Sequence, residues 1–270
     1  MSKRKRREVP RFLTPIIETH CHLDYLDSDT LSQILERVEA AGVERIITIA
    51  VSPSNLELVL NLTRNHAQVW GTQGVHPHEA DTYSATVEHR IREQARNSRI
   101  LAIGEIGLDY YYDHADRRIQ QSVFEHQLQI AADLDMPVVI HTRDADKDTR
   151  DILRNFAPLL KTKGVIHSFT SSMALAEYCL AEGFTLGFNG IVTFNKADNV
   201  RDVVRATPVE RILLETDSPY LTPAPYRGKP NAPYYLPLVA EKVAEIKEMD
   251  VEQLLEQVHH NSVKQFFGSE

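Results

Sequence analysis

Two histidines separated by one residue, His20 and His22, follow an apolar run near the start of the chain. Because a β-strand turns every second side chain to the same face, these two imidazoles can bind one cation. Four further side chains of metal-binding type each follow a short apolar run of their own: Glu105, His141, His167 and Asp217. This repeated pattern of an apolar strand followed by a ligand predicts a metal site assembled from distant parts of the chain.

Each of these residues has an ordinary structural explanation as well. A lone histidine at a strand end is more often hydrogen-bonded than metal-bound, and carboxylates commonly form salt bridges. His20 and His22 differ, because two imidazoles on one side of a buried strand repel each other when charged and need partners when neutral. Glu105 and Asp217 follow mostly apolar residues, where an unpaired charge is costly to desolvate. For the set together we favour a metal site.

Eight strand-like segments alternate with helix-like stretches, and no low-complexity linker separates them. This order predicts an α/β protein with a (β/α)8 TIM-like barrel in a single domain, whose strand ends converge on one face. A doubly wound open sheet is the alternative, but the first strand lacks a Gly-rich phosphate loop. The predicted strands are 15–19, 45–51, 69–75, 100–104, 137–140, 164–167, 185–188 and 211–214. The predicted helices are 31–41, 56–66, 86–97, 117–134, 173–182, 198–206, 233–248 and 251–267.

Composition fits one globular domain with a sizeable core, since 42% of the 270 residues are hydrophobic and 25% are charged. We expect this domain to span residues 13–270, after a flexible basic tail at 1–12. With 30 basic and 38 acidic residues the formal charge is -8, which argues against a broad basic surface that coats nucleic acid. Phosphate recognition must then be local. The basic run at 3–7 could touch a polyanion, although a solvated tail is the favoured interpretation.

The sequence also bears on location. No apolar stretch approaches the ~20 residues that cross a bilayer, and no secretory signal is present, so we expect a cytoplasmic protein without a membrane partner. Its two cysteines, Cys21 and Cys179, are too few for a disulfide framework and should be free thiols. Cys21 lies between the paired histidines but on the opposite strand face, which favours packing over metal binding.

The number of candidate ligands predicts more than one ion. Four histidines, one glutamate and one aspartate exceed what a single tetrahedral ion takes, whereas two ions that share a carboxylate could use all six. Glu105 or Asp217 could be that bridge on chemical grounds. Mixed imidazole and carboxylate ligands suit Zn²⁺, Mn²⁺ or Co²⁺ more naturally than Mg²⁺, so the identity of the two divalent ions stays open.

Seven short motifs follow one another along the chain: ETHCHLD (18–24), GVHPH (74–78), GEIGLDY (104–110), HTR (141–143), HSFT (167–170), ETDSPYL (215–221) and PYRGK (225–229). In type and order they resemble those of the TatD family of metal-dependent deoxyribonucleases in the amidohydrolase superfamily. The resemblance runs from about the first strand almost to the C-terminus. Two positions depart from the family pattern: Glu18 replaces the usual Asp, and Ser171 stands where a Gly is usual.

The resemblance implies a two-metal centre that hydrolyses phosphodiester bonds. It also implies that His76 lies beside the centre and that Arg143 contacts the substrate phosphate or orders the residues around the ligands. The implied ligands are His20, His22 and Asp217 for one ion, His141 and His167 for the other, and Glu105 for both.

The expected function is hydrolysis of DNA phosphodiester bonds, as an exonuclease on single-stranded ends, because an acidic protein and a barrel mouth suit a strand end better than a duplex. Asp217 is the candidate that orients the attacking water and takes its proton, with Glu105 as the second catalytic carboxylate. Arg143 offers a planar fork for two phosphate oxygens, although a structural salt bridge is an equal possibility. No obligate protein partner is evident; the expected partner is DNA or another phosphodiester.

Two other functions stay open: an amidohydrolase-type C–N or ester hydrolase on a small molecule, and a metal-stabilised binding protein without catalysis. The tyrosines at 110–112 could stack on an unpaired base or pack on the barrel. The proline-rich stretch 218–237, with Arg227 and Lys229, could guide a phosphate backbone or shape the rim of the site.

Overall fold

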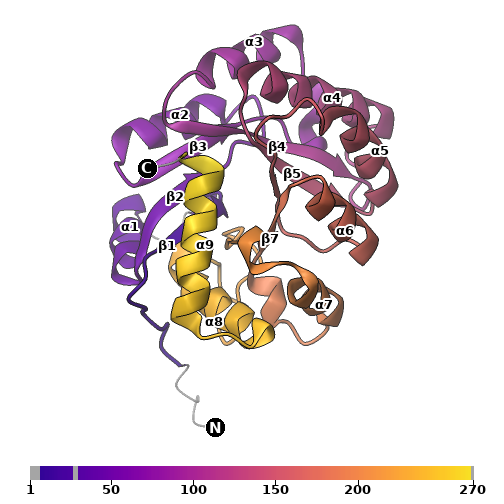
Figure 1. Ribbon diagram of the computed structural model, residues 1–270. Coiled ribbons are helices and arrows are strands. Elements are labelled where there is room, and N and C mark those ends of the chain that lie inside the picture. Colours follow the sequence, from indigo (N-terminus) through magenta and orange to yellow (C-terminus); the bar gives the residue numbers. More distant parts are fainter. Residues whose placement is uncertain (1–6, 27–29, 269–270) are drawn as a thin grey trace.

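An eight-stranded parallel sheet forms the centre of the computed structural model, which describes residues 7–26 and 30–268 (Figure 1). The strands pair in chain order from β1 to β8. β1 meets the segment after β8 through backbone hydrogen bonds, from Asp217 N to His20 O and from His22 N to Ser218 O, each 2.9 Å long. The predicted (β/α)8 TIM-like barrel is therefore confirmed.

All eight predicted strands are present, with ends that differ from the prediction by a few residues. The strands are β1 (Ile16–Cys21), β2 (Val43–Thr48), β3 (Val69–Gln73), β4 (Ile100–Asp109), β5 (Val138–Arg143), β6 (Gly164–Ile166), β7 (Thr185–Phe188) and β8 (Ile212–Leu214). The helices are α1 (Leu31–Ala40), α2 (Leu56–Asn65), α3 (Ala85–Gln94), α4 (Arg117–Leu134), α5 (Asp146–Phe156), α6 (Met173–Ala181), α7 (Asp198–Ala206), α8 (Leu236–Lys247) and α9 (Val251–Phe266). Short 3-10 turns are η1 (Leu23–Tyr25), η2 (Pro77–Thr82), η3 (Gly190–Thr193), η4 (Val209–Arg211) and η5 (Pro233–Tyr235).

Helix α5 was not predicted. Its sequence is dominated by charged residues, and only Thr149, Ile152 and Leu153 of this helix are buried. The few apolar residues fall on one face, but they are too few to form the apolar pattern by which the other helices were predicted. The helix instead begins with two carboxylates in its first turn, Asp146 and Asp148, which interact favourably with the helix N-terminus.

The prediction that each ligand follows a strand is wrong for three of the six. His20 lies inside β1. β4 continues past Glu105 and β5 continues past His141. The pairing of these two strands shifts between Ile103 and Ile106, where β4 carries one residue more than β5. A bulge changes which face of the sheet the nearby side chains point to. Here it turns Glu105, which lies inside β4, toward the site.

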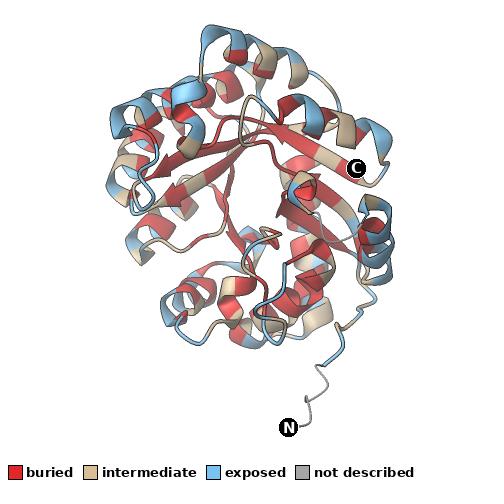
Figure 2. Ribbon diagram, turned by 180° about the vertical axis from the view of Figure 1, so that it is seen from behind, coloured by how far each residue is buried: buried red, intermediate tan, exposed pale blue. Residues whose placement is uncertain are grey.

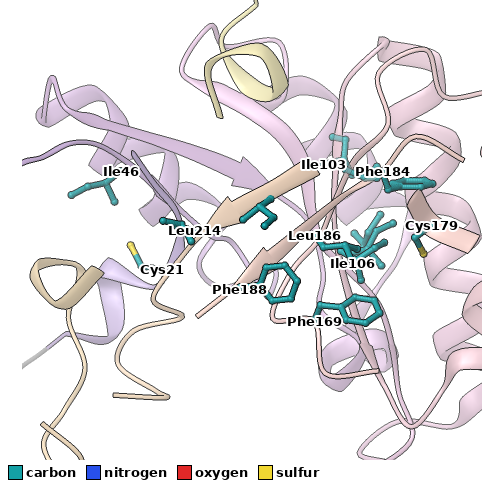
Figure 3. Packing of buried hydrophobic residues seen from close by; sticks show 14 of the residues in the cluster. Cys21, Ile46, Ile103, Ile106, Phe169, Cys179, Phe184, Leu186, Phe188 and Leu214 are labelled. Atoms are coloured by element: carbon teal, nitrogen blue, oxygen red, sulfur yellow. The ribbon is translucent and has the colours of Figure 1, made fainter. Parts of the chain in front are cut away.

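The core has two parts. Between the sheet and the helices lies the larger cluster, part of which appears in Figure 3, where Phe184, Leu186 and Phe188 of the β7 region pack together. Both cysteines are free and lie in this cluster, as predicted, and Cys21 packs rather than joining the histidines. Figure 2 shows the buried residues along the strands and on the helix faces turned toward them.

A second apolar cluster fills the inside of the barrel, and Phe266 of α9 packs against it. Its strand members are Ile47, Ala102, Val139, Val165 and Leu213. Because side chains alternate along a strand, the residue two positions after each member faces the barrel axis as well. For Val139, Val165 and Leu213 those residues are His141, His167 and Glu215. The barrel interior therefore changes from apolar to polar toward the carboxyl ends of the strands.

The segment before β1 contacts the C-terminal helices. Arg7 forms an ion pair with Glu241 of α8, and the backbone N–H groups of Leu13 and Thr14 donate to Glu252 of α9. Residues 1–6 of the predicted tail lie outside the described residues. Within the described part of the chain, the structure contains no helix long and apolar enough to cross a membrane.

Replacement of Phe266 should test whether α9 supports the barrel interior. Phe266→Ala removes a buried ring from the second apolar cluster and is expected to lower the free energy of unfolding by about 3–5 kcal/mol. Urea denaturation monitored by circular dichroism measures this change. Leu159→Ala, at a side chain that is exposed, is the matched control and should change stability by less than about 0.5 kcal/mol. Equal effects of the two substitutions would contradict the packing role of Phe266.

Candidate metal centre

The carboxyl ends of the strands surround a cavity of about 1450 Å³ at the mouth of the barrel. This is the end at which TIM barrels carry their functional residues. His20 is fully buried and lies against the residues that line this cavity. The other five predicted ligands line the cavity itself: His22, Glu105, His141, His167 and Asp217. The structure thus brings the six predicted ligands together.

Glu105 lies at the centre of the group. Its Oε1 atom is 2.8 Å from His167 Nε2, 3.1 Å from His141 Nδ1 and 3.4 Å from His76 Nε2. Its Oε2 atom is 3.4 Å from His20 Nε2. Burial by itself raises the pKa of this carboxyl, but the surrounding histidines more than offset that effect and hold its pKa well below the usual range. Glu105 is therefore an ionised carboxylate shared by four imidazoles.

Asp217 forms a second group with the paired histidines of β1. Its Oδ1 atom is 3.5 Å from His22 Nε2 and 3.7 Å from His20 Nε2. The backbone of Asp217 has a φ of 56°, in the left-handed region that non-glycine residues seldom adopt. Burial raises the pKa of this carboxyl, yet the hydrogen bond from His22 and the neighbouring imidazoles lower it overall. A strained backbone at a residue of this kind is common where a side chain must be held in place.

His20 shows most directly that the cluster suits a cation. Its ring is fully buried and stacks on His167 with 3.8 Å between ring centroids. Among the described residues, neither nitrogen of the His20 ring has a hydrogen-bond partner. Burial lowers the pKa of His20, so the imidazole is neutral and offers a free lone pair. A buried polar group without a partner is costly, and a bound cation would satisfy it.

Three sets of donor atoms lie within 4.8 Å of one another, close enough to hold an ion. They are His20 with His22 and Asp217, His20 with Glu105 and His167, and His76 with Glu105 and His141. Imidazole and carboxylate donors suit divalent transition metals, so the residues present fit such ions. The third set includes His76, which the family resemblance placed beside the centre. Its position next to Glu105 fits a metal ligand as well as a substrate contact.

Asp109 is a buried carboxylate that sequence reasoning missed. Its Oδ2 atom is 3.0 Å from both His141 Nε2 and His78 Nε2. Burial raises the pKa of Asp109, but these hydrogen bonds lower it far below its usual range. Asp109 also raises the pKa of His141, against the effect of burial. Alternation along β4 places Glu105 and Asp109 on one face, so a longer predicted strand would have revealed this residue.

Glu215 is a second buried carboxylate beside the cluster, and it too was missed although it lies in the motif that ends with Asp217. Its Oε1 atom accepts hydrogen bonds from Ser168 N at 2.6 Å and from Asn189 Nδ2 at 3.3 Å, and lies 3.5 Å from His167 Nδ1. A Cβ atom on Gly187 would lie 2.4 Å from Glu215 Oε2. The Glu215 carboxylate, which accepts a hydrogen bond from the backbone just after His167, therefore requires a glycine at position 187 of β7.

Glu18, which departs from the family pattern, binds backbone rather than the ligand side chains. Its Oε1 atom accepts hydrogen bonds from His20 N at 3.1 Å and from Thr216 N at 2.9 Å. Burial raises the pKa of Glu18 to about 8. The residue ties β1 to the segment that follows β8, where Asp217 lies.

Arg143 lies at the rim of the cavity, at the end of β5. Its guanidinium carbon is 4.0 Å from the ring centroid of Tyr111 and 5.1 Å from that of Tyr112. Those two tyrosines are exposed and line the cavity, whereas Tyr110 packs on the barrel and donates a hydrogen bond to Asp148. The packing interpretation of the tyrosine run therefore holds for Tyr110, while Tyr111 and Tyr112 are its members exposed to the cavity.

The basic residues of the proline-rich stretch lie elsewhere. Arg227 stacks on Phe194, with 3.6 Å from its guanidinium carbon to the ring centroid, and donates to Thr222 O. Neither Arg227 nor Lys229 is among the described residues that line the cavity. Of the two interpretations of this stretch, its structure fits a role in shaping the rim.

Carboxylates outnumber lysine and arginine side chains around the cavity. Among the described residues, Arg143 and Lys147 are the only lysine or arginine side chains that line it. A polyanion would be repelled from such a mouth unless bound cations offset the charge. The acidic lining residues are Glu79, Glu105, Asp109, Asp144, Asp146, Asp202 and Asp217.

Known proteins are similar to this chain in sequence and in fold. A protein from Bacillus subtilis (strain 168) named uncharacterized metal-dependent hydrolase YabD is 35% identical over 252 residues, which cover 93% of this chain and 98% of that protein. A protein from Erwinia amylovora named 3'-5' ssDNA/RNA exonuclease TatD is 35% identical over 242 residues, which cover 87% of this chain and 93% of that protein.

The crystal structure of YJJV, a TatD homologue from Escherichia coli K12, has a TM-score of 0.88 and 29% identity, and the match covers 93% of this chain and 98% of that one. The family model described as TatD related DNase matches residues 17–268. This span includes every barrel strand, except for the first residue of β1, and the cavity residues described above. The chain therefore belongs to the TatD-related DNase family.

Proposed function

We propose that this protein is a metal-dependent phosphodiesterase that removes nucleotides one at a time from the 3′ end of single-stranded DNA. The observation that carries the proposal is the buried cluster of four imidazoles around the Glu105 carboxylate, open to a cavity at the barrel mouth. The polarity is taken from the relative in Erwinia amylovora, whose name describes a 3'-5' exonuclease on single-stranded DNA and RNA.

The cluster would hold two divalent ions, drawn from Zn²⁺, Mn²⁺, Mg²⁺ or Co²⁺. When bound, two such ions supply a lowered pKa for a water molecule and neutralise charge on the phosphoryl oxygens. The ligands in this proposal are His20, His22 and Asp217 for one ion, His141 and His167 for the other, and Glu105 for both.

The protein's own residues then have distinct tasks. Asp217 reaches into the cavity as an ionised carboxylate and can orient the attacking water and accept its proton. Arg143 pairs with no carboxylate among the described residues, so its planar fork is available for two phosphate oxygens. His76 lies beside Glu105 and can contact the substrate phosphate or add a donor to the cluster.

Labelled oligonucleotides test the activity and its polarity. With Mn²⁺ or Mg²⁺ present, 5′-labelled single strands should shorten stepwise from the 3′ end, and the chelator EDTA should stop the reaction. Metal analysis should give about two ions per chain at saturation. Duplex DNA should be cut more slowly, because its ends must open before a strand enters the cavity. Intact single strands under all metals would refute a nuclease, and turnover of lactones or cyclic amides instead would favour a C–N or ester hydrolase.

A carboxamide in place of the Asp217 carboxylate provides the residue-level control for that experiment. Asp217→Asn should lower kcat/KM by about 10²- to 10⁴-fold, the size typical of a lost general base. Asp198→Asn, at an exposed aspartate on α7 outside the cavity, should leave kcat/KM unchanged. Comparable activity of Asp217→Asn and the parent protein would remove Asp217 from its proposed role.

The Asp109 carboxylate should matter through His141. Asp109→Asn weakens the hydrogen bond that orients this imidazole, and loss of such a partner typically costs about 10- to 100-fold in metal affinity. Titration calorimetry with Mn²⁺ measures the change. Asp113→Asn, in the segment that follows β4 and paired with exposed Arg117, is the matched control. Unchanged affinity in both variants would show that Asp109 does not position a ligand.

Metal binding should release protons. Burial lowers the pKa values of His22, His141 and His167, but their carboxylate partners raise these values overall, so the metal-free imidazoles keep protons at higher pH than usual. A ligand imidazole must be neutral, so apparent metal affinity should rise as the pH increases from about 6 to about 8. Calorimetry in two buffers with different ionisation enthalpies counts the protons released. An affinity independent of pH would mean that these histidines do not bind the ion.

A further inference from the structure

Two exposed tyrosines lie on the β1 side of the cavity. Tyr25 ends η1, just after β1, and Tyr220 follows β8. Their exposed fractions are 41% and 54%, and both rings line the cavity. The Tyr25 ring lies 5.3 Å from the His22 ring at an interplanar angle of 21°, and the Tyr220 ring lies 6.3 Å from it at 67°. An open ring face beside a candidate ligand is a suitable surface for an unpaired base.

A second pair of exposed tyrosines lies on the opposite side. Tyr111 and Tyr112 follow β4, next to Arg143 at the end of β5. β1 and β8 are neighbours where the barrel closes, whereas β4 and β5 lie halfway around the strand order. Figure 1 shows β4 and β5 across the ring of strands from β1. The two tyrosine pairs therefore flank the Glu105 cluster from opposite sides.

The two sides differ in their basic side chains. Arg143 and Lys147, the only lysine and arginine side chains among the described lining residues, both belong to the β5 side. Lys147 is paired with Asp151, whereas Arg143 forms no ion pair with a carboxylate among the described residues. Acidic residues line both sides, so Arg143 is the group that distinguishes them. A phosphate can therefore contact a cationic side chain on the β5 side, but the described lining beside Tyr25 and Tyr220 offers none.

We propose that Tyr25 and Tyr220 bind the base of the 3′-terminal nucleotide, the one that is removed, while the rest of the strand leaves past Arg143. This inference rests on the proposed function. A terminal nucleotide ends in a hydroxyl group, so it brings no further phosphate to the side of Tyr25 and Tyr220. A strand that continued past the cut would place its next phosphate there, where the described lining contains no lysine or arginine. The position of Arg143 thus favours strand ends over internal positions.

The test compares three single-stranded DNA substrates with the metal-loaded protein: one with a normal 3′ nucleotide, one with an abasic 3′ nucleotide and one with a 3′-terminal phosphate. In the parent protein, loss of the base should lower kcat/KM by about 5- to 100-fold, the range expected for one base–aromatic stack. The terminal phosphate should slow the parent by a similar factor. Removal of the terminal base should also raise, by a similar factor, the Kd of a strand whose terminal linkage cannot be hydrolysed.

The variant Tyr25→Ala/Tyr220→Ala should lose the same factor on the normal strand and should no longer distinguish it from the abasic strand. Tyr25→Phe/Tyr220→Phe keeps both rings and should keep the discrimination. An abasic penalty that persists in the alanine variant would overturn this inference while leaving the nuclease intact. Rapid cleavage of the strand with a 3′ phosphate by the parent would also overturn it. If the parent hydrolyses none of the strands, the proposed function fails, and the inference fails with it.

Discussion

A single desolvated carboxylate organises the mouth of this barrel. Glu105 is buried among four imidazoles, at distances from 2.8 to 3.4 Å. Taking such a charge out of water is expensive unless positive charge or hydrogen-bond donors surround it. The histidines supply part of this compensation in the protein alone, since His167 carries a pKa raised well above its usual value by Glu105 and Glu215 despite its burial. A divalent ion can supply the remainder and leave the imidazoles neutral.

The surrounding backbone is shaped by the need to bring these groups together. The bulge in β4 turns Glu105 inward. Two residues later, Gly107 has a φ of 140°, and a Cβ atom there would lie 1.9 Å from His141 O. Gly187 is restricted in the same way by the Glu215 carboxylate. Glycines thus allow β4 and β5, and then β7 and the His167 loop, to approach closely enough for the donors to share one carboxylate.

Much of this arrangement could be predicted from the sequence, because alternation and apolar runs are local properties that the fold preserves. The eight strands, the barrel and the gathering of the six candidate ligands follow from them. Asp109 and Glu215 escaped prediction because their importance lies in contacts with side chains far away in the chain, such as His78 for Asp109 and Asn189 for Glu215. The bulge that places Glu105 is likewise a property of strand pairing, which a single strand's sequence does not display. Helix α5 was missed because charged residues dominate its sequence and only a few apolar residues mark its buried face.

The apolar side chains that fill the barrel determine from which end molecules can reach and leave the site. Between α9 and the Glu105 cluster, the barrel axis is occupied by buried side chains such as Val139, Val165 and Leu213, with Phe266 at the far end. Among the described residues, this packing closes the barrel axis toward α9, and the cavity opens at the rim formed by the strand ends. In the exonuclease proposed above, the departing mononucleotide and the advancing strand would share that opening. The product would then have to leave before the strand could advance.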